Sequence, residues 1–266
     1  MQITVAAIQM TSTPVVEENI TTVQRLVGDA VAAGAELALL PEYWAIIGMH
    51  EKDKLAQAEQ FGEGAMQNCL RELAKQHGIC LIGGTIPLQS PEASKVLNTT
   101  LVFDPQGACV ARYDKMHLFG FQKGSESYDE SRTILHGDRV GYFAAPFGRV
   151  GLSVCYDLRF PELYRALGDC ALIVVPSAFT DTTGQAHWEV LLRARAIENQ
   201  CYVLAAAQGG VHRNGRRTWG HSMLIDPWGE VLSVLPAGEG VVSGVLDTAR
   251  LAAVRASLPA LQHRRL

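Results

Sequence analysis

The sequence predicts an α/β protein in which two β-sheets lie between layers of helices. Three observations support this fold class. Strand-like segments alternate with helical ones in both halves of the chain, a similar hairpin occurs in each half, and no Pro-, Ser- or Gly-rich linker divides the 266 residues. We therefore expect a single domain over residues 1–266, with two α/β halves that resemble each other.

The first half begins with a predicted strand at 2–9, where apolar and β-branched residues alternate. A helix with Thr13 as its N-cap and Pro14 at its first position should follow, because apolar residues then recur at helical spacing. The remaining elements expected in this half are a buried strand at 36–40, a helix that ends at Gly78 and a buried strand at 80–86.

The second half repeats the alternation. Its expected elements are strands at 149–155, 171–176 and 201–207 and helices at 161–168 and 185–199. The segments 101–113 and 223–235 both place Asp-Pro-x-Gly between two strand-like runs, and Pro and Gly at these positions favour a tight turn. Both segments are therefore predicted to be hairpins. The polar segment 114–138 has little periodicity and predicts an irregular loop, of a length that is usually functional.

Charge and composition exclude several kinds of partner. The chain has 23 Lys and Arg against 27 Asp and Glu, and a net charge of −4 offers no general attraction to nucleic acid or to an anionic membrane. Its apolar runs are far shorter than the roughly 20 residues that cross a bilayer. Six cysteines without a CxxC pair, scattered histidines and no recognisable signal peptide predict a cytoplasmic protein with free thiols and without a metal or cofactor.

Cys155 is the first candidate for chemistry. It stands where an apolar strand turns polar, shortly before a helix that begins near Pro161. A nucleophile at a strand-to-helix turn can project into a cleft, where backbone N–H groups are free to bind an oxyanion. The alternative is a buried, unreactive thiol, which is the commoner fate of a cysteine in a protein core.

Glu42 and Lys115 also follow predicted strands directly. Glu42 stands at the carboxyl end of a buried strand, where α/β folds place their sites, although a solvated loop acid would fit the same position. For Lys115 the alternative is an ordinary surface lysine. Together with Cys155 the two residues make chemical sense, because thiol attack on an amide needs a proton carrier and a positive charge that lowers the thiol pKa and stabilises the oxyanion.

A cysteine–histidine hydrolase is the competing arrangement. His117, His187 and His221 are the candidate bases, and His117 is the best placed because it lies two residues from Lys115. None of the three has a spacing that favours it over the glutamate.

The three candidate residues lie in three separate motifs. LALLPEYW contains Glu42, ARYDKMHLF contains Lys115 and GLSVCYDLRFPELYR contains Cys155. With these motifs in this order, the chain resembles the nitrilase (carbon–nitrogen hydrolase) superfamily over essentially its whole length. The resemblance implies that Glu42 is the general base, Lys115 the oxyanion stabiliser and Cys155 the nucleophile. It also implies a second glutamate that positions the substrate or the lysine, which Glu130 in YDESR matches.

The resemblance implies a fold and an assembly as well. The family fold is a four-layer αββα sandwich of two mixed β-sheets flanked by helices. Two such sandwiches form an αββα–αββα dimer, to which the helix at PELYRAL contributes. We therefore expect a homodimer or a higher homo-oligomer.

The residues after the nucleophile indicate a branch of the family. True nitrilases have Trp-Glu there, whereas this chain has Tyr156-Asp157, as amidases do. The segments 187–210, 220–230 and 258–265 resemble the deaminated glutathione amidase branch, which implies hydrolysis of the γ-amide of deaminated glutathione to 2-oxoglutarate and cysteinylglycine. The alternatives are an ω-amidase acting on 2-oxoglutaramate, another aliphatic amidase or nitrilase, and an acyltransferase that shares the thioester intermediate.

In the expected mechanism the Cys155 thiolate attacks the amide carbon while Glu42 holds the proton. The oxyanion should lie between the Lys115 ammonium and the backbone N–H of Tyr156. Glu42 then protonates the departing amine, and water hydrolyses the thioester with Glu42 as base.

A small anionic amide substrate requires a basic side chain in the pocket. Arg159 is the candidate, because arginine binds a carboxylate through two hydrogen bonds. An internal ion pair with Glu162 or Asp157 is its alternative. Phe179 and Thr180 follow a predicted strand and are expected to line the pocket, although Phe179 fits the core equally well.

Overall fold

The computed structural model describes residues 1–124 and 126–265 and contains two mixed β-sheets whose inner faces share one apolar core. The first sheet has the order β18-β1-β2-β3-β5-β4, with β6 and β9 also paired to β5. Its strands are β1 (Gln2–Gln9), β2 (Leu37–Leu39), β3 (Cys80–Ile82), β4 (Ile86–Gln89), β5 (Val96–Phe103), β6 (Cys109–Asp114), β9 (Ile134–Leu135) and β18 (Gly240–Asp247).

The second sheet has the order β10-β11-β12-β13-β16-β17. Its strands are β10 (Gly141–Ala145), β11 (Gly148–Leu152), β12 (Leu172–Ser177), β13 (Tyr202–Ala207), β16 (Ser222–Ile225) and β17 (Val231–Leu235). β12 and β13 are buried along their whole length, which explains their continuous apolar sequence.

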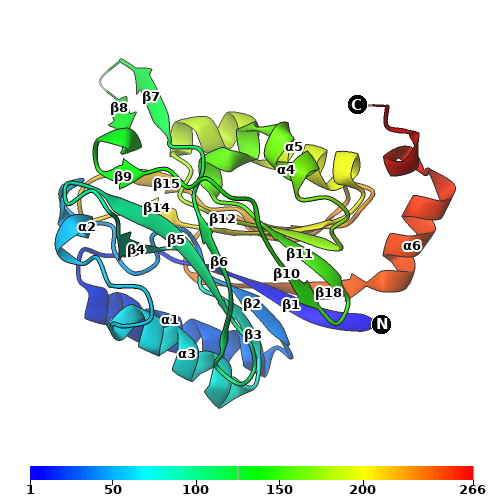
Figure 1. Ribbon diagram of the computed structural model, residues 1–266, viewed down its shortest axis with the longest axis horizontal. Coiled ribbons are helices and arrows are strands. Elements are labelled where there is room, and N and C mark those ends of the chain that lie inside the picture. The colour runs from blue at the N-terminus through cyan, green and yellow to red at the C-terminus, as the bar shows by residue number, and fades with distance from the viewer. Residues whose placement is uncertain (125, 266) are drawn as a thin grey trace.

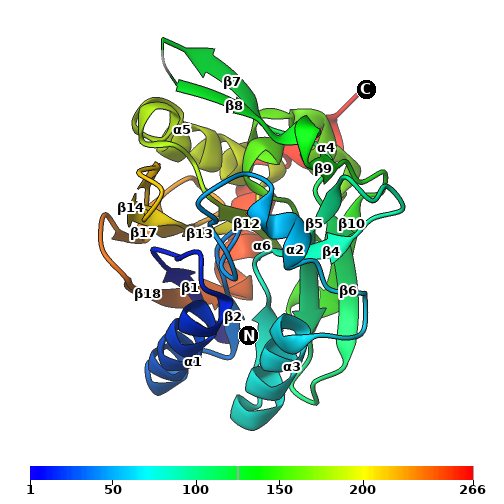
Figure 2. The same cartoon turned by 90° about the vertical axis from the view of Figure 1, so that its left-hand side faces the viewer.

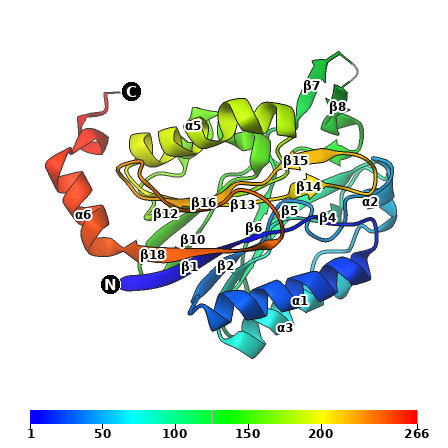
Figure 3. The ribbon, with the colours of Figure 1, turned by 180° about the vertical axis from the view of Figure 1, so that it is seen from behind.

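Helices cover the outer face of each sheet and complete the four αββα layers (Figures 1 and 3). Helices α1 (Val16–Ala32) and α3 (Ala65–His77) pack on the first sheet. Helices α4 (Pro161–Ala166) and α5 (Asp181–Asn199) pack on the second. Each long helix buries one apolar stripe, such as Val23, Leu26 and Val27 in α1, against its sheet. The predicted fold class is confirmed.

The two sheets repeat one arrangement of strands. β1, β2 and β3 are parallel, as are β11, β12 and β13, and an antiparallel strand flanks each set. Both predicted Asp-Pro-x-Gly hairpins are confirmed, as β5–β6 and β16–β17. Their aspartates close the turns in the same way, because Oδ1 of Asp104 and of Asp226 each accepts two backbone N–H bonds.

Some predicted boundaries are wrong. Helix α1 begins at Val16 with Val15 as its N-cap, because the Thr13 hydroxyl accepts a bond from the Val15 N–H in the preceding turn instead. Helix α5 begins at Asp181 rather than 185, because the Thr180 side chain caps it by accepting a bond from Thr183 N–H.

The segment 114–138 is not the irregular loop that its composition predicts. It contains the hairpin of β7 (Gly120–Lys123) and β8 (Glu126–Asp129), the 3-10 helix η1 (Glu130–Arg132) and strand β9. The ring of Phe119 lies 6.0 Å from that of Phe121 and 5.6 Å from that of Tyr128, so aromatic packing supports the hairpin. Position 125 lies outside the described residues.

The carboxyl ends of the parallel strands in both sheets meet at one end of the molecule. Met10, just after β1, forms a parallel bridge with Gln208, just after β13. Helix α2 (Asp53–Ala56), the β7–β8 hairpin and the hairpin of β14 (Gly209–Val211) and β15 (Arg217–Trp219) gather at the same end, which faces the viewer in Figure 2. Helix α6 (Thr248–Ser257) and the 3-10 helix η3 (Ala260–His263) lie at the opposite end (Figure 1).

Across the described part of the chain, none of the helices combines the length and the apolar composition that spanning a bilayer would require.

Candidate active site

Cys155 lies in the turn that follows β11 and begins the 3-10 helix η2 (Cys155–Arg159). The predicted strand 149–155 therefore ends three residues early, at Leu152. The backbone of Cys155 has φ +49°, in the left-handed region that residues other than glycine seldom adopt, and its side chain is only 7% exposed. Strained backbone of this kind is often found at functional sites.

Glu42 and Lys115 are fully buried and bonded to each other. The Lys115 ammonium donates to Oε1 of Glu42 at 2.8 Å, and the Asn98 side-chain amide donates to the same oxygen at 2.9 Å. The other carboxylate oxygen, Oε2, accepts the backbone N–H of Ala178 at 2.9 Å, just beyond β12 of the second sheet. The Glu42 carboxylate therefore joins the two sheets at the end of the molecule where Cys155 lies.

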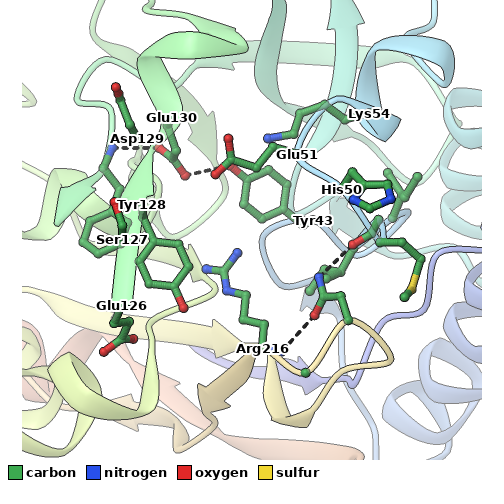
Figure 4. Close-up of a pocket in the computed structure, with 17 residues that line it drawn as sticks. Tyr43, His50, Glu51, Lys54, Glu126, Ser127, Tyr128, Asp129, Glu130 and Arg216 are labelled. Atoms are coloured by element: carbon green, nitrogen blue, oxygen red, sulfur yellow. Dashed lines mark hydrogen bonds between the residues drawn. The ribbon is translucent and has the colours of Figure 1, made fainter. Parts of the chain in front are cut away.

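Glu130 completes the buried cluster of charges. Its Oε2 accepts bonds from the Lys115 ammonium at 2.7 Å and from the Phe119 N–H at 2.8 Å. Its Oε1 accepts the hydroxyl of Tyr43 at 2.7 Å, which Figure 4 shows. The four residues predicted to be catalytic, at positions 42, 115, 130 and 155, are thus brought together from the two halves of the fold.

The buried charges shift the pKa values of Lys115 and Glu130 in definite directions. Burial by itself lowers the pKa of Lys115, but Glu130 and Glu42 outweigh burial and raise that pKa above its usual range. Burial by itself raises the pKa of Glu130, and Lys115 reverses the shift, so the pKa is lowered. Lys115 and Glu130 are therefore a charged pair at neutral pH.

The pKa of the Cys155 thiol is raised well above its usual range. Burial is the largest cause and the negative charge of Glu42 adds to it, while Lys115 acts in the opposite direction. The expected effect of Lys115 on the thiol pKa is present, but it does not dominate. The resting side chain is a neutral thiol that needs a base to react.

Asp157 supports the turn that carries Cys155, a role that its place in the sequence does not reveal. Its buried carboxylate accepts bonds from Val154 N–H at 2.8 Å and from the Tyr113 hydroxyl at 2.7 Å. It also binds the backbone N–H of His117 at 3.0 Å and the His117 ring Nδ1 at 2.7 Å. Asp157 therefore ties the Cys155 turn to the segment that carries Lys115.

The three candidate histidine bases lie in other surroundings. Besides binding Asp157, the His117 ring stacks on Phe160, with 3.8 Å between ring centroids. His187 contacts Arg159, and His221 stacks on Trp219. Among the described residues, no histidine lines the narrow pocket at Cys155. The main charges that act on the Cys155 thiol come from Glu42, Lys115 and Glu130 instead.

The pocket at Cys155 contains the other residues that the sequence singled out. Tyr156, Arg159, Phe179 and Thr180 all line it. The guanidinium of Arg159 lies 5.7 Å from the ring centroid of Tyr156 and 5.3 Å from that of Phe179. Phe179 is also part of the core, where its ring packs against Trp188. Thr180 lines the pocket while it caps α5.

Arg159 does not form the internal ion pair that was its alternative. Within the described part of the chain no carboxylate lies at ion-pair distance from its guanidinium, and its Nη1 contacts the His187 ring at 3.2 Å instead. Asp157 is occupied by the bonds described above.

A cavity larger than the Cys155 pocket lies next to it. Its volume is about 480 Å³, and Tyr43, Lys54, Phe119, Glu130 and Arg216 are among its lining residues (Figure 4). The pocket at Cys155 is much smaller but shares Phe119, Glu130 and Arg216 with it, so the two spaces adjoin. Tyr43 stands in the LALLPEYW motif, where Glu42 alone drew attention, and no motif or spacing distinguishes Lys54 or Arg216 from surface residues.

None of the described residues forms a group of three or more His, Cys, Asp or Glu side chains suited to hold a metal ion. The described site consists of charged and polar side chains arranged around a thiol.

A buried Glu–Lys–Glu cluster beside a cysteine on a four-layer αββα sandwich defines a class of hydrolase. The chain belongs to the carbon–nitrogen hydrolase family, whose model matches residues 4–256. It is an amidohydrolase that acts on carbon–nitrogen bonds other than peptide bonds.

Two relatives and one solved structure are similar to this chain over nearly its whole length. The deaminated glutathione amidase of Synechocystis sp. is 43% identical over 265 residues, which is 97% of each chain. The human omega-amidase NIT2 is 38% identical over 268 residues, which cover 98% of this chain and 94% of the relative. The crystal structure of the C. elegans NitFhit protein superposes on this chain with a TM-score of 0.90 at 38% identity. The superposition covers 99% of this chain and 65% of the NitFhit chain.

Proposed function

We propose that this chain hydrolyses the γ-amide of deaminated glutathione and releases 2-oxoglutarate and cysteinylglycine. The observation that carries the chemistry is the Glu42–Lys115–Glu130 cluster buried beside Cys155. The choice of substrate is supported by relatives named deaminated glutathione amidase, which are 40–43% identical over nearly the whole chain.

Cys155 acts as the nucleophile in this proposal, and Glu42 carries the proton. Because the pKa of the thiol is raised, Glu42 removes the thiol proton as Sγ bonds to the amide carbon. The carbonyl electron pair moves to the oxygen, which the Lys115 ammonium and the Tyr156 N–H stabilise. Glu42 then gives its proton to the amine nitrogen as the carbon–nitrogen bond breaks and a thioester remains.

Water completes the reaction. Glu42 takes a proton from the water molecule as the water oxygen attacks the thioester carbon. Glu42 then returns this proton to sulfur as the carbon–sulfur bond breaks. Glu130 positions Lys115 through their 2.7 Å contact and keeps the ammonium aimed at the reacting oxygen.

Arg159 binds the keto-acid carboxylate of the substrate in this proposal, with Phe179 and Thr180 beside it. The position of its guanidinium in the Cys155 pocket and its lack of an ion pair among the described residues support this role. A cation in that position can form two hydrogen bonds to a carboxylate.

The alternative substrate is 2-oxoglutaramate, which has the same acyl group but releases ammonia. The 38% identity to the human omega-amidase supports it as the second candidate. The deciding assay compares both amides side by side through the 2-oxoglutarate that each releases. We expect a higher kcat/KM for deaminated glutathione; a strong preference for 2-oxoglutaramate would overturn the substrate assignment and leave the mechanism intact.

Two controls belong to the same assay. Cys155→Ala should abolish turnover of both amides, whereas Cys109→Ala, which changes an exposed thiol, should leave it unchanged. Activity retained in Cys155→Ala would contradict the mechanism. Added hydroxylamine should trap little of the acyl group relative to hydrolysis; preferential hydroxamate formation would identify an acyltransferase.

We also propose a cytoplasmic homo-oligomer. Six free cysteines suit a reducing compartment. The apolar side chains of Val190 and Ile197 are exposed on the outer helix α5, and covering them in a dimer would remove apolar surface from water. Light scattering on the purified protein measures the oligomeric state directly.

A further inference from the structure

The cavity of about 480 Å³ beside the Cys155 pocket is lined by two cations that form no ion pair with a described carboxylate. Lys54 reaches it from α2, and Arg216 reaches it from the turn between β14 and β15 (Figure 4). In the described part of the chain neither forms an ion pair. Two unpaired cations facing one cavity favour an anionic occupant.

The surroundings of Lys54 show that it is only partly satisfied. Its ammonium donates one bond, to the Thr133 hydroxyl at 3.3 Å, and lies 5.4 Å from the ring centroid of Tyr43. Burial is the largest influence on the pKa of Lys54, and the net shift is downward. The charges of Glu130 and Glu51 act against burial, whereas that of Arg216 adds to it. An anion bound next to Lys54 would supply the missing partner.

Arg216 is held in place but is also incompletely bonded. Its Nη2 donates to the Ala178 carbonyl oxygen at 2.7 Å, and its guanidinium lies 5.4 Å from the ring centroid of Tyr128. Its Nε is buried and has no hydrogen-bond partner among the described residues. Because Arg216 lines both the cavity and the Cys155 pocket, it stands where the two spaces meet.

The carboxylates that also line the cavity are occupied or exposed. Glu130 is bonded to Lys115, as described above. Glu126 accepts the Thr182 hydroxyl at 2.9 Å, and Asp129 accepts bonds from Ser131. Glu51 is exposed to solvent. None of them is at ion-pair distance from Lys54 or Arg216 among the described residues.

We propose that Lys54, assisted by Arg216, binds the terminal carboxylate of the amine half of the substrate, so that the large cavity is the leaving-group subsite. This inference rests on the proposed function and deepens it. Deaminated glutathione has a carboxylate on each side of the scissile amide. The acyl carboxylate belongs to the Cys155 pocket, which Arg159 lines, and the cysteinylglycine carboxylate belongs to the cavity, which Lys54 lines.

The size of the cavity agrees with this assignment. The leaving group extends for about two residues, or roughly 7 Å from the amide nitrogen to its carboxylate. A space of about 480 Å³ is within the usual range for small-ligand sites. 2-Oxoglutaramate leaves ammonia behind and has no group that would fill the cavity, so this subsite is where the two candidate substrates differ.

The test compares Lys54→Met with wild type on deaminated glutathione and on its analogue with a terminal carboxamide. Wild type should prefer the carboxylate, and Lys54→Met should reduce that preference roughly tenfold or more, mainly through KM, because a charge-assisted hydrogen bond is lost. Lys54→Arg should restore part of the preference. Lys52→Met, which removes an exposed lysine two residues away, is the matched control and should leave the preference unchanged.

The outcomes separate this inference from the function on which it rests. If wild type is active but Lys54→Met lowers kcat/KM equally for both compounds, Lys54 acts through Glu130 or the fold, and the subsite assignment is overturned. If wild type prefers the carboxamide or makes no distinction, the assignment is also overturned. If wild type hydrolyses neither compound, the proposed function itself fails, and the subsite fails with it.

Discussion

At the residue scale, Cys155 and Glu42 are buried close enough for the charge of Glu42 to shift the pKa of the thiol. Reactive cysteines commonly have a lowered pKa in electropositive surroundings. Here burial and the negative charge of Glu42 outweigh Lys115, and the pKa of the thiol is raised. In the proposed mechanism, the same glutamate that makes the free thiolate unfavourable accepts the thiol proton during attack.

Replacing Glu42 should separate its effect on the thiol pKa from its proposed role as the proton acceptor. Glu42→Gln removes the negative charge, so the pKa of Cys155 should fall and its alkylation by iodoacetamide should begin at lower pH than in wild type, even though kcat collapses. Peptide-resolved mass spectrometry over a pH series measures the Cys155 profile. Glu72→Gln, an exposed change on α3, is the control. An alkylation profile that stays in place or moves to higher pH in Glu42→Gln would refute this account of the charges.

At the element scale, the short helix η2 depends on bonds to its neighbours. A five-residue 3-10 helix has little stability of its own, and its first residue has a strained backbone. The buried side chain of Arg195 in α5 donates two bonds to the Leu158 carbonyl oxygen at 2.7 and 3.1 Å. Asp157 holds the opposite side through β6 and the segment after it.

Asp157→Asn should weaken both the fold and the catalysis. The carboxamide keeps one acceptor oxygen and directs an NH₂ group at donors that need an acceptor, which costs about 2–4 kcal/mol of unfolding free energy. We also expect kcat to fall, because η2 would shift the thiol relative to Glu42. Urea unfolding and steady-state kinetics measure the two effects. Asp138→Asn, a change at an exposed position, should lower neither the unfolding free energy nor kcat. An Asp157→Asn variant with normal stability would rule out the role of Asp157 in supporting η2.

At the scale of the whole molecule, the two halves are joined by buried polar residues near the site. Gln208, after β13, exchanges hydrogen bonds with Ser12, after β1, and donates to the Glu42 carbonyl oxygen at 3.0 Å. His212 lies between β14 and β15 and bonds through its two ring nitrogens to the Ser12 carbonyl oxygen and the Thr218 hydroxyl. Burial is the main reason that the pKa of His212 is lowered to about 4.

His212 should make the protein less stable in acid. Its folded pKa of about 4 lies below the ordinary value of 6.5, so its stabilisation is complete above about pH 6.5 and is lost as pH falls toward 4. The difference corresponds to about 3 kcal/mol. His212→Gln should therefore lose less unfolding free energy than wild type between pH 7.5 and 4.5 in urea titrations. His263→Gln, at an exposed position, should behave like wild type; an unchanged acid dependence in His212→Gln would exclude the link.

Local pattern was enough to predict the layers and most elements of this fold. Alternating strands and helices predicted the two sheets, and Asp-Pro-x-Gly located both hairpins. The β7–β8 hairpin was missed because aromatic contacts, rather than alternation or turn residues, hold it together. The start of α1 was misplaced because the Thr13 hydroxyl bonds within the turn before the helix.

Sequence motifs were enough to single out Glu42, Lys115 and Cys155 as candidates for chemistry, because each stands at the end of a predicted strand. How these residues act on one another depends on the tertiary structure. The direction of the Cys155 pKa shift depends on burial and on charges from both sheets, which sequence spacing does not encode. Lys54 and Arg216 likewise line one cavity only because the fold brings two residues that are more than 150 positions apart to the same end of the molecule.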